Sequence, residues 1–68
     1  MGDFTKSQAK RWVQQELAKH TTGDSIRTRL TSEEAMIAKG DKYGLPNAYQ
    51  AHKDLKAALD TRLAEMAA

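Results

Sequence analysis

The sequence predicts an all-α protein, a small three-helix bundle with a long C-terminal amphipathic helix. An apolar stripe with helical spacing runs through residues 46–67. Two helix-capping signatures occur earlier in the chain, and glycine or proline separates the helical stretches. The 68 residues fit one helical domain, 1–68, with helices expected at about 6–20, 32–43 and 46–67.

The first helix is expected to begin just after Thr5. Thr5 and Gln8 have the spacing of a capping box, in which each side chain binds the other residue's backbone N–H. The helix is expected to end near His20, and Gly23 suits the left-handed residue that often closes a helix. Residues 1–3 precede the cap and are expected to fray.

The second helix has a less certain beginning. Residues 24–30 fit either a single capped turn or an irregular segment, and both interpretations stay open. Thr31 and Glu34 repeat the capping-box spacing, which predicts a helix from residue 32. This helix either ends with Gly40 as its cap or continues, weakened by the glycine, to residue 43.

The third helix is the clearest element in the sequence. Pro46 favours extended backbone in the residue before it, and either Pro46 occupies the first helical position or Asn47 is the N-cap over Gln50. At 100° per residue, Leu55, Leu59, Leu63 and Met66 fall on one arc, which also carries several alanines. Such a narrow stripe allows close approach to a partner but buries modest area.

The small apolar core predicts self-association. About 1.5 kcal/mol of ordering cost per residue, set against about 25 cal/mol per Å² of buried apolar area, leaves a monomer of this size near zero. The chain has no cysteine to form a disulfide. We therefore expect a homodimer, or another protein partner, on the long helix. The expected interface residues are Tyr49, His52, Leu55, Leu59, Arg62, Leu63 and Met66. Arg62 could pack its stem at the edge of the arc or pair with a carboxylate of a second chain.

Charge is small overall but uneven along the chain. The net charge is +2, yet residues 1–30 carry six Lys or Arg against three Asp or Glu, whereas residues 31–68 carry five against six. A charged contact surface should therefore lie in the first half. Its expected members are Lys6, Lys10, Arg11, Arg27 and Arg29.

No motif predicts catalysis, a metal or a cofactor. His20 and His52 are the only imidazoles, and no Cys or well-spaced carboxylate accompanies them on the expected helices. His52 is interpreted as a packed or interface residue and His20 as a cation at a helix end. No glycine-rich phosphate loop is present. We therefore expect that the protein is not an enzyme.

These observations favour a non-catalytic protein-interaction module, an adaptor or inhibitor that docks a helical face on another macromolecule. The alternative is a small helix-turn-helix-like DNA-binding regulator that uses the basic N-terminal half, because residues 33–55 have the outline of that motif. Absent cysteines and the lack of an apolar signal segment or membrane span favour a cytoplasmic protein without a membrane partner. A phage or another mobile element would be a fitting origin for such a chain.

Overall fold

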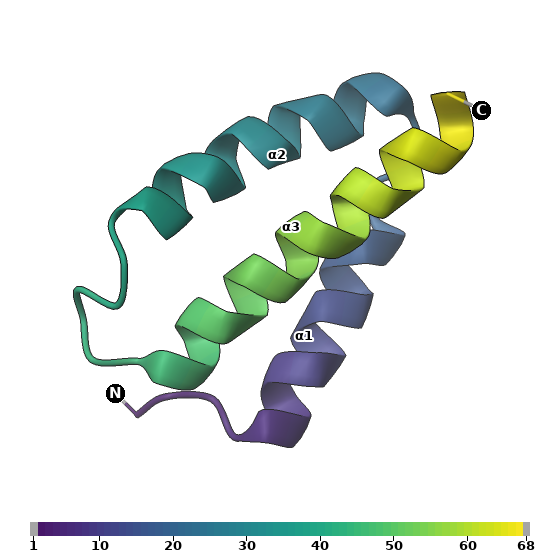
Figure 1. Cartoon of the computed structure of the whole chain (residues 1–68). Coiled ribbons are helices and arrows are strands. Elements are labelled where there is room, and N and C mark those ends of the chain that lie inside the picture. Colours follow the sequence, from purple (N-terminus) through teal and green to yellow (C-terminus); the bar gives the residue numbers. More distant parts are fainter. Residues whose placement is uncertain (1, 68) are drawn as a thin grey trace.

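The computed structural model describes residues 2–67 and contains three α-helices (Figure 1). They are α1 (Lys6–Ala18), α2 (Gly23–Ala38) and α3 (Pro46–Ala67). Residues 2–67 include no β-strand. The all-α prediction is therefore confirmed, and so are the beginning of α1 and both ends of α3.

Helix α1 begins as its local sequence predicts. The Thr5 side chain accepts a hydrogen bond from the backbone N–H of Gln8 at 3.1 Å, and the Gln8 side chain accepts one from the backbone N–H of Thr5 at 3.0 Å. The helix ends at Ala18, two residues before the expected position. Gly23 does not close it, so that prediction is wrong: Gly23 is the first residue of α2.

Helix α2 is longer than expected and includes the ambiguous residues 24–30. The Thr22 side chain accepts a hydrogen bond from the Ser25 backbone N–H at 3.2 Å, which makes Thr22 the N-cap. The predicted start near residue 32 is wrong, because Thr31 lies inside the helix and its hydroxyl donates to the Arg27 carbonyl at 3.2 Å. The same helical face carries buried residues before and after Thr31, so tertiary packing keeps the backbone helical through this position.

The end of α2 follows one of the two expected patterns. The helix stops at Ala38, and Gly40 adopts a left-handed conformation with φ of +67°. Glycine adopts this backbone without the steric penalty of a Cβ atom. The alternative, a helix that continues to residue 43, is wrong.

The N-terminal segment caps α3 from the opposite end of the chain. The Asp3 carboxylate accepts hydrogen bonds from the backbone N–H groups of Asn47 and Ala48, at 2.6 and 2.8 Å. A carboxylate at this position satisfies free N–H groups and complements the positive end of the helix dipole. The expected fraying is therefore wrong for Asp3, while residue 1 lies outside the described residues.

Helix α3 lies between the other two helices and packs against both (Figure 1). Four large apolar side chains from α2 and α3 form the buried core: Ile26, Leu30, Leu55 and Leu59. Partly buried side chains from α1 pack against this core: Trp12, Val13 and Leu17. No side chain of α1, residues 6–18, is fully buried. Apolar burial therefore holds α1 less firmly than α2 and α3.

A charged side chain of α3 binds the end of α1. The Arg62 guanidinium donates hydrogen bonds from Nη1 to the backbone carbonyls of Leu17 and His20, at 3.0 and 3.3 Å. A cation at this position supplies a further donor to carbonyls at the end of the helix and complements the negative end of its dipole. Asp3 and Arg62 thus join α1 and its preceding segment to α3 at both ends.

Candidate functional site

A hydrogen-bonded network of charged side chains and one imidazole joins the three helices inside the fold. Glu33 of α2 is 3% exposed. Its carboxylate accepts hydrogen bonds from Arg29 Nε at 2.7 Å and from His52 Nδ1 at 2.5 Å. Arg29 also binds Glu16 of α1 through Nη1 at 3.0 Å. These four residues, which we call the interior ion-pair network, connect α1, α2 and α3.

Trp12 covers one side of this network. Its ring lies 4.9 Å from the His52 ring, centroid to centroid, in an edge-to-face arrangement. The Arg29 guanidinium carbon lies 5.9 Å from the centroid of the Trp12 ring, within the range of a cation–π contact. The indole therefore shields both partners of Glu33 from part of the solvent.

Two members of the network, Arg29 and Glu16, have shifted pKa values. Burial alone would lower the pKa of Arg29, but its hydrogen bonds with Glu33 and Glu16 raise that pKa above the ordinary value. Hydrogen bonds from Lys19 and then from Arg29 lower the pKa of Glu16 below its ordinary value of 4.5. Arg29 and Glu16 are thus held in their charged forms.

The arrangement satisfies its polar groups internally. Among the described residues, every buried side-chain nitrogen or oxygen has a hydrogen-bond partner. His20, the second histidine, does not bind Glu33. Its Nδ1 shares a 2.6 Å hydrogen bond with Ser25 Oγ. Residues 2–67 contain no group of three or more His, Asp or Glu side chains that could hold a metal ion. The network has the character of a structural element that fixes helix positions.

The apolar residues predicted to form an interface occupy different environments. Leu55 and Leu59 are 0% exposed and lie in the core of the chain itself. Leu63 packs against that core and is partly buried. Met66 is 49% exposed, close to the end of α3. The arc predicted from the sequence exists, but α1 and α2 cover most of it, so Leu55 and Leu59 are not available to a partner.

The polar residues of the predicted interface also make contacts within the chain. His52 belongs to the interior ion-pair network, and Arg62 binds the carbonyls at the end of α1. Neither expected role of Arg62 matches this capping geometry. Tyr49 is half-buried, and its hydroxyl donates to the Ile37 carbonyl at 3.4 Å.

The predicted basic surface is divided among three places. Lys6, Lys10 and Arg11 are exposed on α1. Arg27 is exposed on α2 and pairs with a carboxylate of the same helix at 3.3 Å. Arg29 is inside the network and does not belong to an open surface. Of the five predicted residues, only Lys6, Lys10 and Arg11 lie on the same helix with exposed side chains that form no ion pair.

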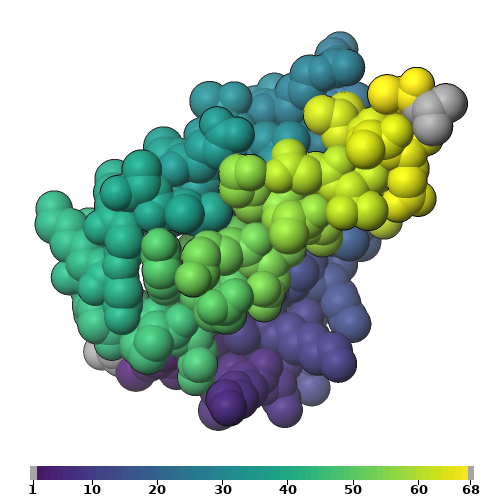
Figure 2. All heavy atoms as spheres, viewed as in Figure 1, coloured from purple at the N-terminus to yellow at the C-terminus, as the bar shows by residue number. Residues whose placement is uncertain are grey.

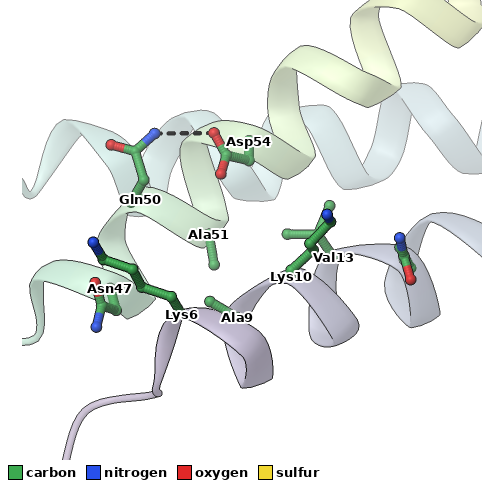
Figure 3. Close-up of a pocket in the computed structure, with 9 residues that line it drawn as sticks. Lys6, Ala9, Lys10, Val13, Asn47, Gln50, Ala51 and Asp54 are labelled. Carbon is green, nitrogen blue, oxygen red and sulfur yellow. Dashed lines mark hydrogen bonds between the residues drawn. The ribbon is translucent and has the colours of Figure 1, made fainter.

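A groove of about 500 Å³ runs between α1 and α3 (Figure 3). Its floor contains the small side chains Ala9 and Val13 of α1 and Ala51 of α3. Ala9 and Ala51 point toward one another in Figure 3, and their small size leaves the space above them open. We call this feature the α1–α3 groove.

The two walls of the α1–α3 groove differ in charge. Lys6 and Lys10 belong to the α1 wall, and Gln50 and Asp54 belong to the α3 wall (Figure 3). Gln50 donates a hydrogen bond to Asp54 at 2.9 Å. Neither Lys6, Lys10 nor Asp54 forms an ion pair with any residue of 2–67. Charges of opposite sign therefore line the groove without pairing across it.

The connection between α2 and α3, residues 39–45, presents a tyrosine to solvent. Tyr43 is 70% exposed. Two glycines of this segment, Gly40 and Gly44, have φ of +67°, and the Asp41 carboxylate accepts a hydrogen bond from the Leu45 backbone N–H at 2.6 Å. We call residues 39–45 the tyrosine loop. The Asp41 hydrogen bond constrains the turn before α3, and the two glycines occupy its left-handed positions.

A small recess lies beneath the tyrosine loop. It has a volume of about 100 Å³ and is lined by side chains that include Met36, Tyr43, Leu45 and Tyr49. Met36 is itself exposed. Figure 2 shows this hollow between the loop and the beginning of α3.

Sequence reasoning missed the role of Glu33, although a signal was present. Ile26, Leu30 and Glu33 follow the spacing of one helical face, which predicts that the carboxylate faces inward with them. Arg29 precedes Glu33 by one turn and is a suitable ion-pair partner. Interpreting Thr31 as a cap obscured this face, because it placed these residues on either side of a helix boundary.

No family model matches this chain, and comparison with curated proteins and with solved structures gives no match. Of the helices within residues 2–67, none combines the length and apolar character needed to cross a membrane.

Proposed function

We propose that this protein is a non-catalytic protein-interaction module that docks through the tyrosine loop. The observation that carries the proposal is the 70% exposure of Tyr43 on a loop with a hydrogen-bonded turn. Tyrosine supplies a large contact area with a polar tip and is enriched among residues that dominate binding energy. The Asp41 hydrogen bond restricts the conformations of the loop, which lowers the entropy that the loop would lose on association.

The surroundings of Tyr43 indicate what kind of partner would fit. Lys39 and Lys42 are exposed on the same loop, and neither forms an ion pair within residues 2–67. The complementary surface is an apolar pocket with an acidic rim, which would receive the Tyr43 ring and attract the two lysines. Met36 and the recess beside it would receive an apolar side chain from the partner.

Docking of this kind suits an adaptor or an inhibitor. The protein would act by covering part of its partner's surface, and no group of its own would need to react. A cytoplasmic location, which fits the cysteine-free sequence, is part of the same proposal.

Affinity capture with paired variants tests the proposal. Wild type, Tyr43→Ser and Met66→Ser serve as baits, because Met66 is also an exposed apolar side chain but lies at the opposite end of α3. The proposal expects a protein that wild type and Met66→Ser retain and Tyr43→Ser loses. Calorimetry with the purified partner should then show a Kd more than about tenfold higher for Tyr43→Ser. Equal retention by all three baits, or loss only with Met66→Ser, would overturn the proposed docking surface.

Nucleic-acid binding is the second candidate, and one observation favours it. Lys6, Lys10 and Arg11 are exposed on α1 and form no ion pair within residues 2–67. The helix-turn-helix outline lends little support, because residues 39–45 separate α2 from α3, whereas that motif uses a turn of about 3 to 4 residues. Binding to a DNA duplex that weakens steeply with salt, and is lost in Lys10→Glu and Arg11→Glu, would favour this candidate.

A further inference from the structure

We infer that the α1–α3 groove is the contact surface of a homodimer in which Lys10 of each copy pairs with Asp54 of the other. The groove is open, has a volume of about 500 Å³ and has a floor of alanine and valine side chains. Small floor residues allow the backbone of another helix to approach closely. This inference is independent of the tyrosine loop and extends beyond the proposed function.

Charge complementarity identifies a second copy as the occupant. The α1 wall carries Lys6 and Lys10, while the α3 wall carries Asp54. A uniformly acidic partner would satisfy the lysines and place its own carboxylates near Asp54. A second copy carries both signs in the same arrangement, so it satisfies both walls at once.

Symmetry determines how two grooves can meet. A two-fold axis along the groove places α1 of one copy over α3 of the other, and every contact then occurs twice. Lys10 faces Asp54 of the second copy, and Asp54 faces Lys10. Turning one copy end over end instead would place α1 over α1 and would oppose lysines of the two copies. Repulsion between like charges disfavours that arrangement.

The size of the molecule also favours such an interface. Within residues 2–67, the core contains four large buried apolar side chains, and α1 contributes none of them. A stable dimer buries about 800 Å² per partner. The chain exposes 4760 Å², and an interface centred on the groove would cover part of α1, the more loosely held helix.

Charge exchange provides a sharp test. In the dimer of Lys10→Glu, each Glu that replaces Lys10 would face Asp54 of the other copy, so two pairs of carboxylates would repel. In the dimer of Asp54→Lys, each new Lys would face Lys10 of the other copy, so two pairs of ammonium groups would repel. Each single variant should raise the dimer dissociation constant by about tenfold or more. The double variant Lys10→Glu/Asp54→Lys should restore association, because it exchanges the signs of both walls. An equimolar mixture of the two single variants should form a heterodimer for the same reason.

Two control variants carry the same charge changes outside the groove lining. Arg11→Glu is adjacent to Lys10 on α1, and Glu65→Lys lies on α3 beyond Asp54. Sedimentation equilibrium across a wide dilution series measures the mass of each sample, and circular dichroism measures its helicity. Wild type and both controls should reach twice the 7.6 kDa of the chain at high concentration.

Several results would overturn the inference. Wild type could stay at 7.6 kDa throughout the series, or a dimer could form equally well in both single variants. Single variants that dissociate without recovery in the mixture would also contradict the reciprocal pairing. Because Tyr43 does not line the groove, Tyr43→Ser should leave the mass unchanged, so failure of the proposed function and failure of the dimer are separate results.

Discussion

Removing the Glu33 carboxylate should destabilise the fold far more than removing the carboxylate of Glu34, the next residue. Glu33→Ala leaves Arg29 Nε and His52 Nδ1 without their acceptor in a largely covered site. Removing one partner of a buried ion pair costs about 3 to 5 kcal/mol. The side chains of Arg29 and His52 are 22% and 24% exposed, so water can reach them and the lower end of that range applies.

The expected loss is therefore about 3 kcal/mol of unfolding free energy. A domain of 68 residues has a total of about 3 to 10 kcal/mol, so Glu33→Ala should be partly or largely unfolded. Urea denaturation followed by circular dichroism and Trp12 fluorescence measures the loss. All variants are compared at one protein concentration, because self-association would add to apparent stability.

Glu34→Ala is the matched control for this measurement. Glu34 is the next residue of the same helix and is exposed, so its removal should change the unfolding free energy by no more than about 0.5 kcal/mol. A double-mutant cycle with His52→Ala should give a coupling energy of about 1 kcal/mol or more between Glu33 and His52. Similar stabilities for Glu33→Ala and Glu34→Ala, or a coupling near zero, would refute a stabilising role for the network.

Further predictions concern the helix ends and the titrating carboxylates. Partial burial would raise the pKa of Asp3, but backbone hydrogen bonds hold it below its ordinary value of 3.8, and the pKa of Glu16 is also lowered. Both carboxylates therefore stabilise the fold at pH values above their ordinary pKa values. Thermal melts should show this contribution to stability disappearing as the pH falls from about 5 to 2. The melting temperature of Asp3→Asn should decline less over the same range. Arg62→Met should lower the unfolding free energy by about 1 to 2 kcal/mol in urea titrations, because the carbonyls of Leu17 and His20 lose a charged donor. Gly40→Ala should lower the unfolding free energy by about 1 to 2 kcal/mol in the same assay, because alanine is strained at this positive φ. No steric clash adds to this loss, since a Cβ atom there would meet nothing within 4 Å.

Local signals in the sequence predicted the elements whose ends they determine. The beginning of α1 follows from the Thr5 capping box, and the beginning of α3 follows from Pro46. The capping sequence at Thr31 wrongly predicted a helix start there. Such a sequence also fits the interior of a helix when buried residues lie on the same helical face before and after it. Local chemistry permits a cap there, and tertiary packing decides against it.

Contacts between distant parts of the chain could not be predicted in this way. Asp3 lies 44 residues from Asn47 in sequence, and Arg62 lies 45 residues from Leu17. The periodicity of α3 correctly indicated an apolar arc, but periodicity does not show whether the same chain or another chain covers it. The arc is covered largely by α1 and α2, so the α1–α3 groove and the tyrosine loop are the surfaces that remain open to a partner.

The separation of these two surfaces has a consequence for binding. The side chains lining the α1–α3 groove and those lining the recess under the tyrosine loop have no member in common. A dimer formed through the groove would therefore leave both copies of Tyr43 available. Two docking loops on one particle would bind a partner that carries two sites more tightly than one loop would, through effective concentration alone. Lys10→Glu should then weaken binding to a two-site partner without changing affinity for an isolated site, whereas Tyr43→Ser should weaken both.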